Sequence, residues 1–138
     1  MALGQLSGVG MDCVFCELRE DRIRESNDHC IAIFDGFPIS SGHTLVIPKR
    51  HVSSFCDLAA EERHALFSLV ELAKHHLDVE YAPDGYNIGI NDGTAAGQTV
   101  SHVHLHLIPR YSGDCDDPRG GVRWIMPSKA KYWIDDVD

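Results

Sequence analysis

The seven residues from His102 to Ile108 constrain the fold more than any other part of the chain, because histidine and bulky apolar residues alternate strictly along them. Side chains in a β-strand point alternately to the two faces of the sheet. In an extended conformation the three imidazoles would share one face, while Val103, Leu105 and Leu107 would share the other. The pattern predicts a strand whose apolar face packs under a helix and whose opposite face carries a histidine cluster.

Two simpler interpretations of this cluster are an ordinary surface strand that happens to be rich in histidine and a metal-binding patch of the polyhistidine kind. Strict alternation over three histidines, with bulky apolar residues between them, is improbable by chance in a natural domain. We therefore favour a chemical role for the cluster.

The segments around this strand predict an α+β fold. Short apolar runs over residues 29–34 and 43–48 are bounded by Gly and Pro, so they predict two strands that pair as a hairpin. Residues 86–91 and 100–108 predict a second pair of strands, separated by a polar loop. With a long helix between the two pairs, this order predicts a mainly antiparallel sheet of about five strands, covered by the helix on one face.

The helix is predicted over residues 57–81, where apolar residues recur at helical spacing. Asp57 is the expected N-cap, and two glutamates follow in the first turn, where the helix dipole favours negative charge. The polar face carries three histidines, which we expect to be ordinary surface residues: His64, His75 and His76.

Length and composition favour one compact domain. The chain has 138 residues, of which 43% are hydrophobic, enough to build a core. We expect residues 1–11 to be a disordered N-terminal extension and residues 12–138 to form a single domain with a C-terminal tail, whose secondary structure the pattern does not assign. The sequence shows neither an apolar run that could span a membrane nor a secretory signal, so we expect a cytoplasmic protein without a membrane partner.

The formal net charge of −9 argues against a nucleic-acid-binding protein, because affinity for nucleic acid comes mainly from positive side chains that neutralise many phosphates. A small anionic ligand is compatible with this charge, since a local pocket can be positive on a negative protein. Five of the 12 basic residues lie towards the C-terminus, where they could face phosphate: Arg110, Arg119, Arg123, Lys129 and Lys131.

The alternating run resembles the signature of the histidine-triad family, in which three histidines alternate with apolar residues and two more apolar residues follow. The resemblance extends from Cys13 to about Trp133 and includes Ser41–His51 and the stretch from Asn91 to Arg110. It implies a homodimer whose two protomers join into a ten-stranded sheet, with a nucleotide or dinucleotide bound over each triad.

The resemblance also implies catalytic roles. His104, the middle histidine, would attack the α-phosphate, and His106 would support the transferring phosphoryl oxygen and the leaving group. His43 would orient His104, and His102 completes the catalytic set. Imidazole suits this role, because its pKa of about 6.5 leaves it largely neutral at pH 7 and able to form a phosphoimidazole that water later opens.

Six further residues match positions that bind substrate in the family. Gln98 and Thr99 would hold phosphate oxygens, and Asn91 would contact the phosphate or the ribose. The ribose hydroxyls would bind Asp35, and the walls of the base site would be Ile33 and Phe15. The simpler interpretations are that Asp35 and Asn91 form turns and that Ile33 and Phe15 fill the core.

The cysteine pattern predicts a structural zinc site. Five cysteines, an odd number, argue against a disulfide framework. Cys13 and Cys16 form a Cys-x-x-Cys pair that needs two further ligands, and in a subset of histidine-triad proteins these are the counterparts of His51 and His102. A redox pair or two thiols without a role are the alternatives, and catalysis itself would need no metal.

The resemblance suggests three functions. The first is a Fhit-like hydrolase of dinucleoside polyphosphates, indicated by the Gly-Gln-Thr-Val run before the triad. The second is a Hint-like phosphoramidase, favoured by Asp35 and Asn91, and the third is a nucleotide-binding module without catalysis. The tail over residues 117–124, with Lys129 and Tyr132-Trp133 beyond it, could bind the distal phosphates and second nucleoside of a long substrate, or it could cover the dimer.

Overall fold

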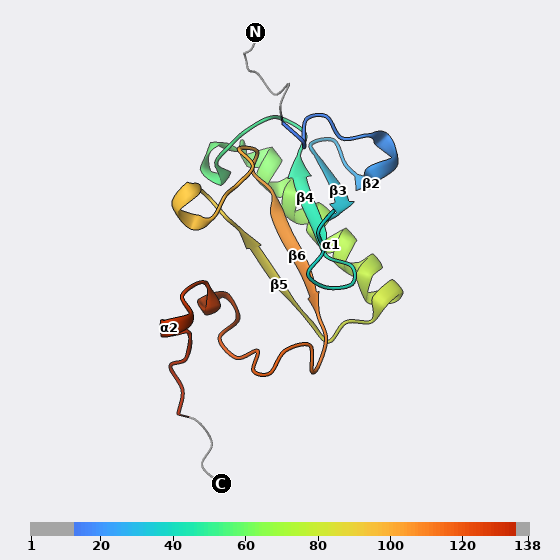
Figure 1. Cartoon of the computed structure of the whole chain (residues 1–138). Helices are drawn as coiled ribbons and strands as arrows, with labels where there is room; N and C mark the ends of the chain where they lie inside the picture. The colour runs from blue at the N-terminus through green and yellow to red at the C-terminus, as the bar shows by residue number, and fades with distance from the viewer. Residues whose placement is uncertain (1–12, 135–138) are drawn as a thin grey trace.

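The computed structural model describes residues 13–134, so the expected extension over residues 1–11 lies outside the described residues (Figure 1). One antiparallel sheet with the strand order β2-β3-β4-β6-β5 packs against the helix α1 (Ala60–Tyr81). The strands are β2 (Ile23–Ser26), β3 (Cys30–Phe34), β4 (Thr44–Pro48), β5 (Gly85–Ile90) and β6 (Leu105–Arg110). The predicted α+β fold is confirmed.

Both predicted strand pairs are present. Strands β3 and β4 pair over their whole length, with Ala32 opposite Val46, and β5 pairs with β6, with Gly89 opposite His106. Strand β2, which the sequence analysis did not predict, adds to the outer side of β3. Its sequence Ile-Arg-Glu-Ser holds a single apolar residue, which is too little for a recognisable period.

Strand β6 begins later than predicted, although Val103 still packs in the helix-face cluster with Leu105 and Leu107, as the alternation predicts. The expected strand covered residues 100–108, whereas the ladder covers Leu105–Arg110. In the register of β4 with β6, Val103 would lie opposite Pro48, which has no N–H to donate. The backbone leaves the ladder there, and the N–H of Val103 instead donates to the carbonyl of Val52 at 2.7 Å.

The start of α1 also differs from the prediction. Asp57 is not the N-cap, because it ends a short 3₁₀ helix (Phe55–Asp57) and the next two residues stay extended. The helix begins at Ala60, and the Glu62 carboxylate accepts the N–H of Ala59 at 2.8 Å. Glu62 thus satisfies one of the donors that a helix start leaves open, which removes the need for a cap at Asp57.

Glu62 is buried, with 5% of its surface exposed, and pairs with the Arg50 guanidinium at 2.8 and 3.0 Å. Bonds from Arg50 and from the Ala59 N–H lower the pKa of Glu62 from 4.5 to about 2. A carboxyl whose pKa falls on folding stabilises the protein fully above its unfolded pKa, and this contribution is lost as the pH falls towards the folded value. The contribution of Glu62 should therefore be complete above pH 4.5 and disappear towards pH 2.

We expect Glu62→Gln to lower the free energy of unfolding at pH 7 by about 2 kcal/mol, because a charged hydrogen bond is lost in a buried position. Urea unfolding at pH 7 and at pH 3 checks this, and the difference from the parent protein should shrink at pH 3. Glu61→Gln, an exposed change in the same helical turn, is the control and should have little effect. An equal loss at both pH values would contradict the assigned ion pair.

Two apolar clusters fill the two faces of the sheet. On the helix face, Leu105 and Leu107 pack against buried residues of α1, namely Ala65, Leu66, Leu69, Val70, Ala73 and Leu77. On the opposite face, Ile31, Ile33, Leu45 and Ile47 are covered by the N-terminal residues Phe15 and Leu18 and by Ile23. This second cluster spans only β3 and β4, so the same face over β6 and β5 is available for a site.

The C-terminal tail, which the pattern left unassigned, contains a 3₁₀ helix η5 (Gly121–Ile125) and the one-turn helix α2 (Pro127–Ala130). In Figure 1 it runs back from the end of β6 to the β5 side of the molecule. The three histidines expected at the surface of α1, His64, His75 and His76, are exposed. Among residues 13–134, no helix combines the length and the apolar character needed to cross a bilayer.

Candidate active site

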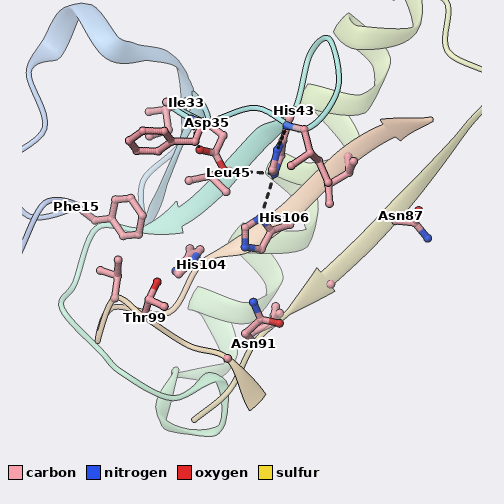
Figure 2. A pocket seen from close by; sticks show the side chains of 18 of the residues that line it. Phe15, Ile33, Asp35, His43, Leu45, Asn87, Asn91, Thr99, His104 and His106 are labelled. Atoms are coloured by element: carbon pink, nitrogen blue, oxygen red, sulfur yellow. Dashed lines mark hydrogen bonds and ion pairs between the residues drawn. The ribbon is translucent and has the colours of Figure 1, made fainter. Parts of the chain in front are cut away.

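A cavity of about 860 Å³ lies on the face of the sheet opposite α1. Three histidines, His43, His104 and His106, meet in it (Figure 2). His43 immediately precedes β4, whereas His106 lies within β6 and His104 just before it. The sheet therefore brings together one histidine within β6, one just before β6 and one just before the neighbouring strand β4.

Hydrogen bonds fix the protonated nitrogens of two of these rings. The Nδ1 of His43 lies 3.2 Å from the N–H of Ile39, and because that N–H can only donate, Nδ1 must accept. In neutral His43 the proton is then on Nε2, which lies 3.0 Å from His106 Nδ1 and 3.4 Å from Asp35 Oδ2 (Figure 2). His106 accepts on Nδ1, so its own proton is on Nε2.

His104 is oriented by the backbone and not, as the sequence analysis expected, by His43, whose ring bonds to His106. The Nδ1 of His104 lies 2.9 Å from the carbonyl oxygen of His102, which can only accept, so Nδ1 carries the proton. The lone pair of the neutral ring is consequently on Nε2. The Phe15 ring packs at 4.9 Å between centroids and the His106 ring at 5.1 Å, and the residue is 8% exposed. This arrangement gives a fixed imidazole with an unprotonated nitrogen.

Burial keeps the surrounding imidazoles neutral. It lowers the pKa of His43, with Asp35 acting in the opposite direction. It also lowers the pKa of His106, and there the neighbouring rings of His104 and His43 add to the effect. Both directions favour the uncharged rings at neutral pH, so the chain of hydrogen bonds described above is the form present near pH 7.

His102 does not line the cavity; its ring turns to the N-terminal cysteines. Its Nδ1 lies 3.5 Å from both Cys13 Sγ and Cys16 Sγ, and Cys16 Sγ lies 3.2 Å from His51 Nδ1. The four ligand atoms all lie within 4.8 Å of one another. The three predicted catalytic histidines of the motif therefore divide, with His104 and His106 at the cavity and His102 in a Cys₂His₂ cluster.

The Cys₂His₂ cluster has the chemistry of a structural zinc site. Zn–S bonds of about 2.3 Å and Zn–N bonds of about 2.0 Å in a tetrahedron place neighbouring ligand atoms roughly 3.3–3.8 Å apart, close to the spacing found here. His102 donates from Nε2 to the Pro48 carbonyl at 2.7 Å, which leaves Nδ1 unprotonated and directed at the thiols. The residues present fit zinc.

Five of the six predicted substrate residues line the cavity: Phe15, Ile33, Asp35, Asn91 and Thr99 (Figure 2). Asp35 also accepts the N–H of Phe37 at 2.8 Å, as a turn residue would. Ile33 also belongs to an apolar cluster, as a core residue would. Both residues therefore have a structural role in addition to their place in the cavity wall. Gln98 does not line the cavity. Its amide accepts the N–H of Gly93 and donates to the carbonyls of Ser53 and Val100, so it braces the loop instead.

The sequence analysis missed several lining residues. Asn87 and Gly89 alternate along β5 in phase with the predicted residue Asn91, and because Gly89 pairs with His106 they belong to the histidine face. This alternation was visible in the sequence. No local signal indicated the apolar lining contributed by loops and by the tail: Val14, Leu18, Ile39, Val122 and Ile125.

The chain is similar to known proteins over most of its described length. The family model of the HIT domain matches residues 18–113. Adenylylsulfatase HINT3 from Arabidopsis thaliana is 36% identical over 109 residues, which cover 75% of this chain and 55% of that protein.

Two solved structures extend the comparison. A zinc-bound histidine triad family protein from Mycobacterium smegmatis has a TM-score of 0.68 and 38% identity, covering 77% of this chain and 80% of that one. Diadenosine triphosphate hydrolase from Plasmodium falciparum, solved in complex with Cyclomarin A, has a TM-score of 0.68 and 26% identity. The match covers 72% of this chain and 68% of that one. With the matched domain and the histidine cavity together, the chain belongs to the HIT-domain family of nucleotide-binding hydrolases and transferases.

Proposed function

We propose that the protein cleaves a bond at the α-phosphorus of a nucleotide through a nucleotidyl-His104 intermediate. The Nε2 lone pair of His104 forms the new P–N bond as the bond to the leaving group breaks. Water then attacks the phosphorus, releases the nucleoside monophosphate and restores His104. The observation that carries this proposal is the bond from His104 Nδ1–H to the His102 carbonyl, because it holds the unprotonated Nε2 ready inside the cavity.

His106 and His43 complete the proposed proton path. With its proton on Nε2, His106 can donate to the departing group, and the bond from His43 to its Nδ1 holds the ring in that tautomer. When the His43–His106 pair takes up a proton, Asp35, 3.4 Å from His43 Nε2, stabilises the resulting positive charge, and the pair can then give this proton to the departing group. This is the arrangement in which a second group fixes the tautomer and position of the first.

The remaining lining residues divide between the two parts of the nucleotide. We assign the base to the apolar walls Phe15 and Ile33, and the ribose to Asp35 beside them. Thr99 and Asn91 lie on the other side of His104 and are assigned to the phosphate oxygens (Figure 2). Gln98 is not part of this assignment, because its amide oxygen already accepts a bond from Gly93 and its amide nitrogen already donates to Ser53.

Two substrate classes fit this site. Dinucleoside polyphosphates are the first, since the cavity of about 860 Å³ extends well beyond the proposed nucleoside position, and a diadenosine triphosphate hydrolase is among the similar structures. Nucleoside phosphoramidates are the second, favoured by the scarcity of cations: Arg22 is the only lysine or arginine among the described residues that line the cavity.

The decisive experiment is an intact-mass measurement after brief mixing of the protein with diadenosine triphosphate or with adenosine 5′-phosphoramidate. The expected result is an adenylyl adduct that peptide mapping places on His104. A protein that binds both compounds but never forms the adduct would be the non-catalytic nucleotide-binding module. An adduct on another histidine would contradict the assignment of the nucleophile.

Two further features belong to the proposal. A structural zinc ion held by Cys13, Cys16, His51 and His102 would tie the N-terminal segment to the sheet, supported by the donor set and by the zinc-bound relative from Mycobacterium smegmatis. A homodimer would form by pairing of β5, an edge strand of the described sheet, with β5 of a second copy, giving ten strands.

A further inference from the structure

One charged group that lines the cavity has no role in the proposed function, the guanidinium of Arg22. Arg22 ends the short 3₁₀ helix η2 (Glu20–Arg22) directly before β2, and its side chain lines the cavity. One of its terminal nitrogens donates to the carbonyl oxygen of Phe34 at 3.0 Å, and a Cβ added at Gly36 would lie 4.0 Å from the same nitrogen. The guanidinium is therefore held beside the end of β3.

This position is at the end of the cavity that the proposed function assigns to the base. In the strand order of the sheet, β3 with its wall residue Ile33 stands between β2, which Arg22 precedes, and β6, which carries His106. Ile23, the residue after Arg22, pairs with Ile33 across the two strands. A base that packs on Ile33, with its phosphate at His104, therefore directs its outer edge towards Arg22.

Arg22 has no acidic partner. No ion pair among residues 13–134 includes it, whereas Arg19, three residues earlier, pairs with Asp21. A guanidinium carries several N–H donors and no acceptor. Since the bond to the carbonyl on β3 uses only one of these donors, the others can bind a ligand that offers acceptors.

The wall around this end of the cavity is mainly apolar. The side chains that Arg22 accompanies there are Val14, Phe15, Leu18 and Ile33. The one carboxylate among the described lining residues is Asp35, which is assigned to the ribose. Apolar walls cover the faces of a base but give its edge no hydrogen bonds, so the polar partner of that edge at this end is Arg22.

The edges of the two purines differ in what they offer to a guanidinium. Guanine presents two acceptors, O6 and N7, whereas adenine presents N7 beside a 6-amino group that donates. A guanidinium can therefore bond to guanine through two parallel N–H groups, but at adenine one of its N–H groups meets another N–H. A 2′-phosphate, which a cation would also attract, is disfavoured because the Asp35 carboxylate at the ribose would repel it.

We propose that Arg22 binds the O6 and N7 edge of a guanine base and makes the protein prefer guanine nucleotides to adenine nucleotides. The inference rests on the proposed function, which places the base at Ile33 and Phe15, and adds a choice of base to that site. Adenine nucleotides still bind through the apolar walls and the ribose contact, with lower affinity.

The test measures the binding of guanosine, inosine and adenosine 5′-monophosphates by calorimetry. Inosine monophosphate keeps the O6 and N7 of the guanosine compound but lacks its 2-amino group, so it should bind as the guanosine compound does. We expect both to bind about tenfold more tightly than adenosine monophosphate. This is near the lower end of the effect of such a pair, because Arg22 is exposed.

Arg22→Met, which keeps the length of the side chain but removes every donor, should remove most of this preference and leave the affinity for adenosine monophosphate nearly unchanged. Arg22→Lys keeps the charge but not the two parallel N–H groups, so it should also lose most of the preference. Arg19→Met is the matched control, because Arg19 is bound to Asp21 and does not line the cavity. It should keep the full preference.

Equal affinity of the parent protein for the guanosine and adenosine compounds would overturn the inference, as would a preference that survives in Arg22→Met. Inosine monophosphate that binds only as adenosine monophosphate does would also overturn it, because the 2-amino group would then be the recognised feature. A loss in Arg22→Met that is confined to adenosine 2′,5′-bisphosphate would assign Arg22 to a phosphate instead.

The proposed function is tested separately, by adduct formation on His104 with guanosine and adenosine 5′-phosphoramidates. A protein that selects guanine in binding but forms no adduct with either compound would keep the inference and lose the chemistry. A protein that forms the adduct but binds the three monophosphates equally would keep the chemistry and lose the inference.

Discussion

His104→Ala is expected to lower kcat/KM by about 10⁴-fold or more and to abolish the nucleotidyl adduct, because no other group in the cavity can replace a nucleophile that forms the covalent bond. The loss should be in kcat, since the proposed nucleoside contacts at Asp35, Ile33 and Phe15 do not involve the His104 nitrogen that reacts. Single-turnover mixing followed by mass measurement checks both effects at once.

The control for this variant is His64→Ala, which removes an exposed imidazole from α1, on the far side of the sheet from the cavity. It should behave as the parent protein does. Binding of adenosine monophosphate by calorimetry should change only a few-fold in His104→Ala, which shows that the pocket is still formed. If His104→Ala kept its turnover, the covalent mechanism would be wrong, and a nucleotide-binding module without catalysis would be the better description.

The sequence was sufficient for the part of the site that depends on strand alternation. His104 and His106 lie two residues apart on one side of the chain, and both reach the cavity as the pattern predicts. The two apolar residues between and after them enter the core under α1. The two-residue alternation was informative here because the two faces of this segment differ strongly: one carries apolar residues that are buried, and the other carries histidines.

His102 shows what alternation leaves undetermined: it predicts the face, since Phe15 packs on both His102 and His104, but not which neighbours on that face the ring contacts. Its ring bonds to the Pro48 carbonyl and lies 3.5 Å from the sulfurs of Cys13 and Cys16, which come from segments distant in sequence. The same holds for Asp57, which matched the residue preferences of a cap although the chain stayed extended for two more residues and Glu62 provided the acceptor. Both differences arise from contacts between segments distant in sequence or from competing local hydrogen bonds.

Gln98 and the tail show a second limit. A glutamine beside the triad could equally bind phosphate or brace a loop, and only the positions of Gly93, Ser53 and Val100 decide that it braces. The arginines of the tail suggested phosphate binding by composition, whereas their guanidinium groups bond to tail carbonyls and to Asp117. The residue type determines which bonds a side chain can form, but the neighbouring groups in the folded protein determine which of these bonds it does form.

The other large effect is expected from loss of the proposed zinc site. Cys16→Ser should abolish stoichiometric zinc binding, because a tetrahedral site cannot close on three of its four ligands with the same affinity. A ligand present at 1,000 times its dissociation constant stabilises the folded state by about 4 kcal/mol, and for a domain of this size that corresponds to a fall in Tm of roughly 10 °C or more. Zinc content by atomic emission and Tm by calorimetry are the measurements.

The zinc prediction also concerns the nucleotide site, because Phe15 lies between the two cysteines and packs on both His104 and His102. Without the metal, the segment from Cys13 to Leu18 loses its tie to His51 and to His102, so the proposed base wall loosens. We therefore expect Cys16→Ser to weaken adenosine monophosphate binding several-fold, even in an assay without turnover. Cys56→Ser, an exposed thiol outside the cluster, should change none of these quantities. Full zinc content in Cys16→Ser, or a parent protein whose Tm does not respond to removal of zinc by a chelator, would show that the cluster does not serve as a structural metal site.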